Sequence, residues 1–386
     1  MARKSHKNIG LIGLGIIGSR VAASLRGAGF HVYVWNRSPR AAPNFLGSAA
    51  EIAEVCNTIQ LFVPDAQALF ETIDAFADRL TPSHTILCSA TVGPEATVEA
   101  ARLVQQCGAK FLDAPFTGSK AAAEKGELVY FIGGDDDVLR QVEPVLQASG
   151  KAIVKIGEIG AAATVKIATN MLGAVIVQTL AEAIALVKTA GIDPEILGSA
   201  LEHHGVRSPL IDMKLPGMLQ GDFPPNFSMK HMFKDVQIGM HIANSVEMDL
   251  PATTAAAGVL YAGLNSGWGE LDYSAVVKVY EETKRAPLEL REPERGRALP
   301  APEKAAEPEP VPPVTPVENT IVEPAAAPPP EEPSESKADD TNAVKTEDKP
   351  VVEAKPETEA APPSNPAEPA KMEARPKTFG WLFGKK

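Results

Sequence analysis

Lys166 and Asn170 are the two residues whose types and spacing most directly suggest chemistry. They lie four residues apart, and Lys166 is the only charged residue between Gly160 and Leu180. Residues at this spacing share one face of a helix, so the ammonium and the amide project together from an apolar surface. Burial lowers the pKa of a lysine towards neutral pH, which suits a general acid. The alternative is a core lysine whose flexible stem carries its ammonium to solvent.

The stretch 161–190, which carries both residues, predicts one long helix that is apolar on most faces. Such a helix must be covered on most faces. A membrane span does not account for it, because the run from Lys166 to Glu182 is too short for a bilayer and contains Asn170 and Gln178. The short helices expected after it are too few to cover it. We therefore expect a second copy of the chain to do so, in a homodimer or homotetramer.

The start of the chain carries a dinucleotide-binding pattern. Gly13, Gly15 and Gly18 have the order G-x-G-x-x-G between an expected strand, 8–12, and an expected helix, 19–27. The first glycine permits a tight turn, the second lets the backbone approach a pyrophosphate, and the third lets helix and strand pack closely. The phosphates then bind at the helix N-terminus. The residues expected to surround the pyrophosphate are Gly13, Leu14, Gly15, Ile16, Ile17 and Gly18.

The residues after the second expected strand, 31–35, indicate which cofactor binds. An NAD site usually places an acidic residue there, whereas this chain has Asn36, Arg37 and Ser38. Neutral Asn36 does not repel a 2′-phosphate, and Arg37 can pair with one. A charge-assisted hydrogen bond of about 1.5–3 kcal/mol corresponds to roughly a ten- to hundredfold preference for NADP. The alternative is a solvated arginine, and NAD remains possible.

Strands and helices are expected to alternate through the rest of the first half. The expected strands are 58–63, 84–88 and 110–113, and the expected helices are 67–76 and 95–107. This alternation predicts an α/β fold with a doubly wound parallel sheet, and the short stretch 37–49 predicts an abbreviated connection. Ligands of such sheets bind outside the carboxyl ends of the strands. The residues that this rule places at the cleft are Val63, Pro64, Asp65, Thr91 and the segment 113–119.

Composition excludes several classes of function. A net charge of −12 over 386 residues argues against nucleic acid, because phosphate contacts need a basic face. The three cysteines, Cys56, Cys88 and Cys107, have no C-x-x-C spacing, which indicates reduced, buried thiols in a cytoplasmic protein. His231 and His241 lack the paired spacing of a metal site, and we expect no metal. The glycines in the apolar start favour a first strand over a signal peptide.

The second half is expected to contain short helices up to about residue 285, separated by turns at prolines. These prolines are Pro209, Pro216, Pro224, Pro225 and Pro251. Beyond Pro287 the composition changes to Pro, Ala and Glu, which predicts a disordered tail over 287–386. The chain ends in FGWLFGKK, whose aromatic and basic residues suggest docking to a partner or a membrane surface. Chance hydrophobicity at a terminus is the alternative.

Several separate motifs resemble those of one family. They are IGLGIIG, VWNRS, FVPD, ATVGP, DAPFTGSKAAAEKGEL, GEIGAAATVKIATN, FSMKHMFKD and LDYSAV. Together they resemble the β-hydroxyacid dehydrogenases, which include 3-hydroxyisobutyrate dehydrogenase, and most closely the NADPH-dependent glyoxylate/succinic semialdehyde reductases. The resemblance covers roughly residues 7–285. It is more specific than the glycine motif alone, because the blocks occur in order along the chain.

The resemblance implies a Rossmann domain over 1–160 and a helical substrate-binding and dimerisation domain over 161–286. It implies that Lys166 is the catalytic lysine and that Asn170 is its companion. Three groups of site residues follow from the same resemblance. They are Thr117, Gly118 and Ser119 for the substrate carboxylate, Thr91 and Lys234 for the cofactor, and Phe227 and Asp235 for the substrate pocket.

The chain also departs from the family pattern. It has Thr117 where serine is common, Phe116 where valine is common, Ala90 for serine and Ser24 for asparagine. Thr117 keeps a hydroxyl, but Phe116 adds bulk beside the site, so the substrate is left open. Two alternatives to an NADPH-dependent reductase of small aldehyde acids remain at this point. One is an NAD-dependent dehydrogenase of the 3-hydroxyisobutyrate type, and the other is a non-catalytic nucleotide-binding scaffold that acts through its tail.

Overall fold

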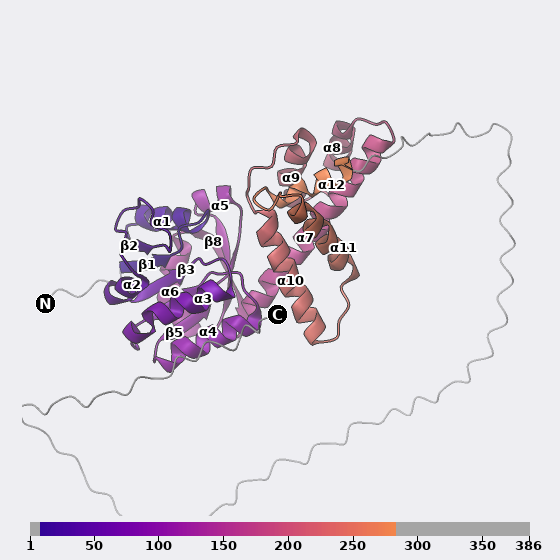
Figure 1. Cartoon of the computed structure of the whole chain (residues 1–386). Coiled ribbons are helices and arrows are strands. Elements are labelled where there is room, and N and C mark those ends of the chain that lie inside the picture. The colour runs from indigo at the N-terminus through magenta and orange to yellow at the C-terminus, as the bar shows by residue number, and fades with distance from the viewer. Residues whose placement is uncertain (1–7, 283–386) are drawn as a thin grey trace, which may run out of the picture. The chain divides into compact units, whose positions relative to one another are not determined.

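The computed structural model describes residues 8–282 (Figure 1). Residues 1–7 and 283–386 lie outside this range, and so do the predicted tail and its aromatic terminus. Strands alternate with helices up to residue 157, and from residue 161 the described chain is helical. The domain boundary predicted at residue 160 falls between these two regions, which belong to a single compact unit.

Five parallel strands form the part of the sheet that was predicted. They are β1 (Asn8–Ile12), β2 (His31–Trp35), β3 (Thr58–Leu61), β4 (Thr85–Cys88) and β5 (Lys110–Asp113). Their order in the sheet is β2-β1-β3-β4-β5, and every neighbouring pair is parallel. Because β2 and β3 lie on opposite sides of β1, the winding of the chain reverses there. Such a switch point leaves a crevice at the carboxyl ends of the strands.

Three further strands extend the sheet beyond β5 and were not predicted. They are β6 (Phe116–Thr117), β7 (Leu128–Gly133) and β8 (Gly150–Gly157). β7 runs antiparallel to β5 and β6 and parallel to β8, so the sheet, which is parallel through its first five strands as predicted, is mixed at this edge. The reason is the connection, because β6 and β7 are joined through the short α5 (Lys120–Glu124) rather than by a full crossover helix.

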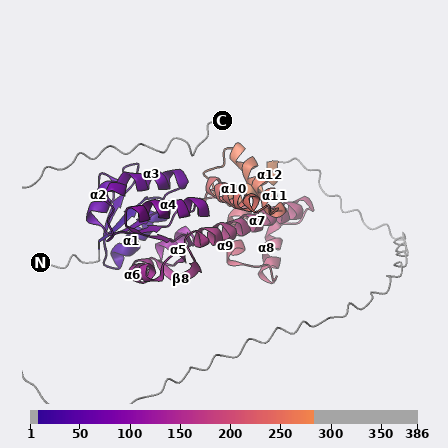
Figure 2. The same cartoon turned by 90° about the horizontal axis from the view of Figure 1, so that it is seen from below.

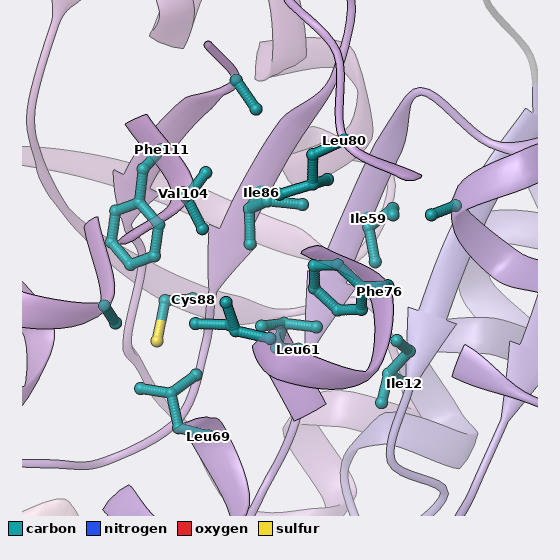
Figure 3. Close-up of a cluster of buried hydrophobic side chains, with 14 of the residues drawn as sticks. Ile12, Ile59, Leu61, Leu69, Phe76, Leu80, Ile86, Cys88, Val104 and Phe111 are labelled. Atoms are coloured by element: carbon teal, nitrogen blue, oxygen red, sulfur yellow. The ribbon is translucent and has the colours of Figure 1, made fainter. Parts of the chain in front are cut away.

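Helices cover both faces of the sheet. They are α1 (Gly18–Gly27), α2 (Ala49–Val55), α3 (Ala66–Phe76), α4 (Pro94–Gln106) and α6 (Asp136–Gln147), with a 3-10 turn at Ala77–Arg79. One core packs Ile59, Leu61 and Ile86 of the strands against Phe76 of α3 (Figure 3). Leu87, next to Ile86 in β4, belongs to the core on the opposite face. Residues 36–48, where an abbreviated connection was predicted, contain no helix, and the short α2 is the crossover helix to β3.

The predicted long helix is α7 (Ala161–Thr189). It contacts β5, β7 and β8 and continues among the helices of the second region (Figures 1 and 2). Asp113, at the end of β5, caps it: Asp113 Oδ2 accepts hydrogen bonds from the N–H groups of Gly160 at 3.0 Å and Ala163 at 2.9 Å. Burial raises the pKa of Asp113 to about 6, although these N–H groups act in the opposite direction. The cap fixes the helix about one turn before Lys166.

The second region packs short helices around α7. They are α8 (Pro194–Glu202), α9 (Pro209–Gln220), α10 (Met229–Ser245), α11 (Pro251–Asn265) and α12 (Val277–Glu282), with a 3-10 helix at Tyr273–Val276. Pro209 and Pro251 begin helices, as expected of a residue whose N–H needs no partner there. Pro216 lies inside α9, so the turn predicted there is wrong. A proline inside a helix removes one backbone hydrogen bond, and here the helix continues past that gap.

The cysteines follow their predictions in part. All three thiols are free, and Cys56 and Cys88 are buried. Cys107 is only half-buried, because it follows the last turn of α4, so the prediction of three buried thiols is wrong for this residue. Burial raises the pKa of the Cys56 and Cys88 thiols to about 12, which keeps both protonated and unreactive. The cytoplasmic location stays a prediction.

Candidate functional site

A cavity of about 510 Å³ lies at the carboxyl ends of the first strands. Its walls also include the loop before α10 and the first turns of that helix. Of the predicted cofactor residues, all except Leu14 line it: Gly13, Gly15, Ile16, Ile17, Gly18, Asn36, Arg37, Ser38, Val63, Pro64, Thr91 and Lys234. The predicted substrate residues Phe227 and Asp235 line it as well. Motifs far apart in the sequence therefore meet at one cavity.

The three glycines of the G-x-G-x-x-G motif have different surroundings. A Cβ on Gly13 would lie 2.1 Å from the carbonyl oxygen of Phe62, and Gly13 has a φ of +100°. A Cβ on Gly18 would lie 2.0 Å from the carbonyl oxygen of Gly13. A Cβ on Gly15 would meet nothing within 4 Å. Gly13 and Gly18 are therefore required by packing, whereas the open space at Gly15, in the turn that leads into α1, fits the pyrophosphate of a dinucleotide.

Asn36 orders the glycine-rich loop. Its Oδ1 accepts a hydrogen bond from the N–H of Leu14 at 2.8 Å, and its Nδ2 donates to the carbonyl of Ser38 at 2.7 Å. This explains the place of Leu14, which is buried and contributes to the site through its backbone. The side chain of Asn36 is therefore a structural link between two cofactor loops, in addition to being uncharged.

Two arginines reach the cavity from the segment after β2. Arg37 was predicted, whereas Arg40 was not, and both line the cavity with exposed side chains. The available signal for Arg40 was its position three residues after Arg37, in a stretch too short for a full crossover helix. Two guanidinium groups at one end of the cavity make that end suitable for a phosphate.

Lys234 of α10 connects the helical region to the sheet. Its Nζ donates a hydrogen bond to the carbonyl oxygen of Thr91 at 2.5 Å. The same Nζ lies 2.8 Å from Asp235 Oδ1, at an ion-pair distance but outside hydrogen-bond geometry. The two residues predicted as cofactor contacts, Thr91 and Lys234, are thus in direct contact with each other.

Lys166, Asn170 and Asp235 form a chain of hydrogen bonds. Lys166 Nζ donates to Asn170 Oδ1 at 2.9 Å, and Asn170 Nδ2 donates to Asp235 Oδ2 at 2.6 Å. The predicted shared face of Lys166 and Asn170 is therefore present. The amide of Asn170 uses both of its ends here, because its oxygen accepts from Lys166 and its N–H group binds Asp235.

A glycine brings the two helices of this chain together. A Cβ on Gly239 of α10 would lie 2.1 Å from Met171 Sδ and 3.2 Å from Ile167 Cγ2, both on α7. Gly239 follows Asp235 by one helical turn, so the close approach of α10 to α7 occurs where Asp235 meets Asn170. The contact between the helices therefore sets the geometry of the hydrogen-bond chain.

Burial sets the protonation of the lysine. Lys166 is 9% exposed, and burial lowers its pKa to about 8. The carboxylate of Asp235 acts in the opposite direction, and the nearby charge of Lys234 acts in the same direction as burial. Desolvation is the largest of the three effects. An amine with this pKa exists in both protonation states near neutral pH, as a general acid requires.

Some predicted site residues do not line this cavity. Lys166 and Asn170 are among them, and the hydrogen bond from Asn170 to Asp235 joins them to its wall. Thr117 ends β6, and Gly118 has a φ of +140°, where a Cβ would lie 2.8 Å from Leu128. Ser119 caps α5 by accepting from the N–H of Ala122 at 3.3 Å. The role of the Thr117–Ser119 loop in holding a carboxylate stays a prediction.

Aromatic side chains narrow the cavity. Phe116 lines it and packs against Phe62 and Tyr130, with ring centroids 5.7 Å and 6.4 Å apart. Phe227 lines it too and stacks on His231, with centroids 6.4 Å apart. Both rings are therefore held in place by aromatic neighbours at the cavity wall.

His231 is a cavity residue for which the sequence motifs indicated no function. It lines the cavity, and its Nδ1 lies 2.7 Å from Ser228 Oγ. Burial, together with the charges of neighbouring lysines, lowers the pKa of His231, which favours the neutral imidazole at neutral pH. The signal in the sequence was its position four residues before Asp235, on the same helical face.

Two family models match the described chain almost end to end. Residues 8–157 match the NAD binding domain of 6-phosphogluconate dehydrogenase. Residues 160–280 match the NAD-binding domain of NADP-dependent 3-hydroxyisobutyrate dehydrogenase. The two matches meet where the last strand of the sheet gives way to α7.

Two named relatives and one solved structure are similar to this chain over most of their own length. L-threonate dehydrogenase of Cupriavidus necator is 30% identical over 285 residues, which are 71% of this chain and 96% of the relative. Glyoxylate/succinic semialdehyde reductase 2, chloroplastic, of Arabidopsis thaliana is 28% identical over 287 residues, which are 72% of this chain and 80% of the relative. The crystal structure of 3-hydroxyisobutyrate dehydrogenase from Salmonella typhimurium superimposes with a TM-score of 0.65 at 26% identity, over 70% of this chain and 99% of that one.

Proposed function

This chain belongs to the β-hydroxyacid dehydrogenase family, and from that premise we propose that it is an NADPH-dependent reductase of small aldehyde acids. The substrate is of the glyoxylate or succinic semialdehyde type, and the product is the hydroxy acid. The observation that carries the proposal is the buried Lys166, linked through Asn170 to Asp235 in the cavity wall. A protein that only binds a nucleotide has no need of a buried ammonium at this position.

Lys166 and Asn170 have different roles in the proposed reduction. A nicotinamide cofactor, when bound in the cavity, would supply the hydride that the aldehyde carbon receives. Negative charge then develops on the aldehyde oxygen, and the Lys166 ammonium gives that oxygen a proton. A pKa of about 8 lets the resulting amine regain a proton from water near neutral pH. Asn170 holds the lysine through its oxygen and Asp235 through its Nδ2. We assign the second hydrogen of this Nδ2 to the same substrate oxygen.

The preference for NADPH rests on the segment after β2. Asn36 stands where NAD enzymes of this fold have an acidic residue, and its amide is occupied in ordering the glycine-rich loop. Arg37 and Arg40 both line the cavity and would pair with a 2′-phosphate. Gly15 and the start of α1 would hold the pyrophosphate.

The proposal of a small aldehyde acid rests on two supports. A relative bears the name glyoxylate/succinic semialdehyde reductase, and Phe116 and Phe227 narrow the cavity. We assign the substrate carboxylate to the loop Thr117–Ser119, by its resemblance to the family's motif. Phe116 is the side chain that we expect to limit the length of the substrate.

Steady-state assays test this function. The purified chain is assayed with glyoxylate and succinic semialdehyde in the reducing direction, and with 3-hydroxyisobutyrate and L-threonate in the oxidising direction, each with both cofactors. We expect turnover of an aldehyde acid with NADPH. Preferred turnover of 3-hydroxyisobutyrate with NAD would favour the alternative dehydrogenase. Absence of turnover with every pair, in a protein that binds NADPH, would favour a non-catalytic scaffold.

A homo-oligomer is part of the same proposal. Along α7, Leu172 is 61% exposed and Leu186 is 64% exposed, and Ile196 on the following helix is 60% exposed. The most apolar window of α7 is hydrophobic enough for a membrane, and only 33% of it is buried within one chain. A second copy that covers these side chains would remove them from water. Light scattering should give a dimer or tetramer mass, and Leu172→Glu should lower it.

A further inference from the structure

Lys214 and Asp272 form a buried ion pair that the proposed chemistry does not use. Lys214 Nζ lies 2.8 Å from both carboxylate oxygens of Asp272, and the two side chains are 4% and 3% exposed. The same Nζ lies 4.5 Å from the centre of the Tyr273 ring. Neither Lys214 nor Asp272 lines the cavity. A buried pair of this kind often contributes little net stability compared with apolar residues of the same volume, so its presence calls for a structural or functional reason.

The Asp272 carboxylate organises the loop before α10. Its Oδ2 accepts hydrogen bonds from the backbone N–H groups of Asn226 at 3.0 Å and Phe227 at 3.1 Å. Its Oδ1 accepts from the N–H of Ser274 at 3.0 Å and from the hydroxyl of Ser274 at 2.8 Å. The carboxylate therefore joins Lys214 of α9 and the loop before α10 to its own segment, more than forty residues further along the chain. The charge of Lys214 is what balances this carboxylate in the interior.

The loop held in this way is a wall of the cavity. Asn226 and Phe227 both line it. Backbone hydrogen bonds reinforce the attachment, because the N–H of Tyr273 donates to the carbonyl of Phe227 at 3.0 Å. The Phe227 ring packs edge-on against Tyr273, with centroids 6.0 Å apart, and stacks on His231 on its other side. The ring that narrows the cavity is thus fixed from behind by the Asp272 segment.

We infer that the Lys214–Asp272 pair is a positioning element, which fixes Asn226 and Phe227 as the substrate-side wall of the cavity. Lys214 neutralises the carboxylate so that both of its oxygens can hold the loop from the interior. The pair contributes to substrate binding without touching the substrate. This inference rests on the proposed function for its kinetic consequence, but its structural consequence is independent of any activity.

The first measurement is hydrogen exchange of the full chain. In Lys214→Met, which keeps the volume and removes the charge, amides of the peptide that contains Asn226 and Phe227 should exchange at least about tenfold faster than in the parent, because their acceptor is no longer held. Peptides from α11 should be unchanged. Lys188→Met is the matched control, because Lys188 forms an exposed ion pair with Glu281 in the same region. Unchanged exchange at 226–227, or a rise spread evenly over all helices, would overturn the inference.

The second measurement is kinetic. Lys214→Met should raise KM for the aldehyde acid about tenfold and change kcat less than about threefold, since a displaced wall weakens ground state and transition state alike. An unchanged KM in a variant with a lowered melting temperature would show a purely structural pair. Where Lys214→Met does not accumulate as folded protein, Lys214→Gln replaces it and is interpreted in the same way. If the parent chain turns over no aldehyde acid, the proposed function fails, and the exchange measurement still decides the inference.

Discussion

Asn170 joins the buried lysine to the cavity by donating a hydrogen bond to Asp235 over 2.6 Å. Its oxygen accepts from Lys166 at the same time, so one amide fixes both the ammonium and the carboxylate. The carboxylate supports the charged form of Lys166, but burial has the larger effect and leaves the pKa at about 8. The arrangement therefore keeps a proton donor ready in the interior near neutral pH.

The pH dependence follows from this balance. Reduction needs the protonated amine, so kcat for an aldehyde acid should fall as pH rises through about 8, the pKa of Lys166. Oxidation of the hydroxy acid needs the neutral amine and should rise over the same range. Asp235→Asn removes the charge that supports the ammonium and should lower the pKa of Lys166 further. The pH profiles for reduction and for oxidation should then both move to lower pH. Profiles of kcat in both directions measure this. A flat profile from pH 7 to 9 would contradict it.

Arg37 gives a prediction about cofactor choice. Arg37→Ala should raise KM for NADPH by roughly ten- to a hundredfold, the value of one charge-assisted hydrogen bond, and leave KM for NADH unchanged. Arg40→Ala should act in the same direction, because Arg40 lines the same cavity. Arg102→Ala is the control, since Arg102 pairs with Glu99 on the surface of α4. Equal effects of Arg37→Ala on both cofactors would remove the argument for a 2′-phosphate contact.

The glycine-rich loop predicts opposite results for two similar substitutions. Gly15→Ala should leave the melting temperature unchanged and weaken NADPH binding, because its Cβ meets no protein atom and occupies the space assigned to the pyrophosphate. Gly18→Ala should lower the melting temperature, because its Cβ would lie 2.0 Å from the carbonyl of Gly13. Thermal melts and fluorescence titration with NADPH separate the two. Unchanged NADPH affinity in folded Gly15→Ala would contradict the placement of the cofactor.

Much of the fold could be predicted from local sequence pattern. β1, β2 and β5 have the predicted bounds, and α7 ends one residue before the prediction. β1, β2 and α7 are mainly apolar runs of the right length between turn residues, and β5 was placed by the alternation of strands and helices. β6 could not be found in this way, because two residues carry no periodicity. The turn predicted at Pro216 is wrong for a different reason. Proline usually breaks a helix, but the packing around α9 keeps this helix continuous past Pro216.

The site was predictable where one motif carries its own chemistry. The glycine spacing and the segment after β2 each specify a contact locally, and the structure brings them to one cavity. The roles of Asp113 and Asp272 could not be found, because each carboxylate acts on backbone groups more than forty residues away. The role of Asn170 could likewise be predicted only in part. Its position on the lysine's face was predictable, but its hydrogen bond to Asp235 depends on the approach of α10 to α7 at Gly239.

The most direct test of the account is the turnover of Lys166→Met. Methionine keeps the volume of the side chain and removes its proton, so NADPH affinity and melting temperature should be nearly unchanged. Lys188→Met, at the exposed end of the same helix, is the control and should keep full activity. The account predicts that kcat of Lys166→Met with NADPH and the best aldehyde acid falls by at least about a hundredfold, the usual range for a general acid. Retention of more than about a hundredth of the parent kcat by a folded, NADPH-binding Lys166→Met would contradict the role of Lys166 as the proton donor.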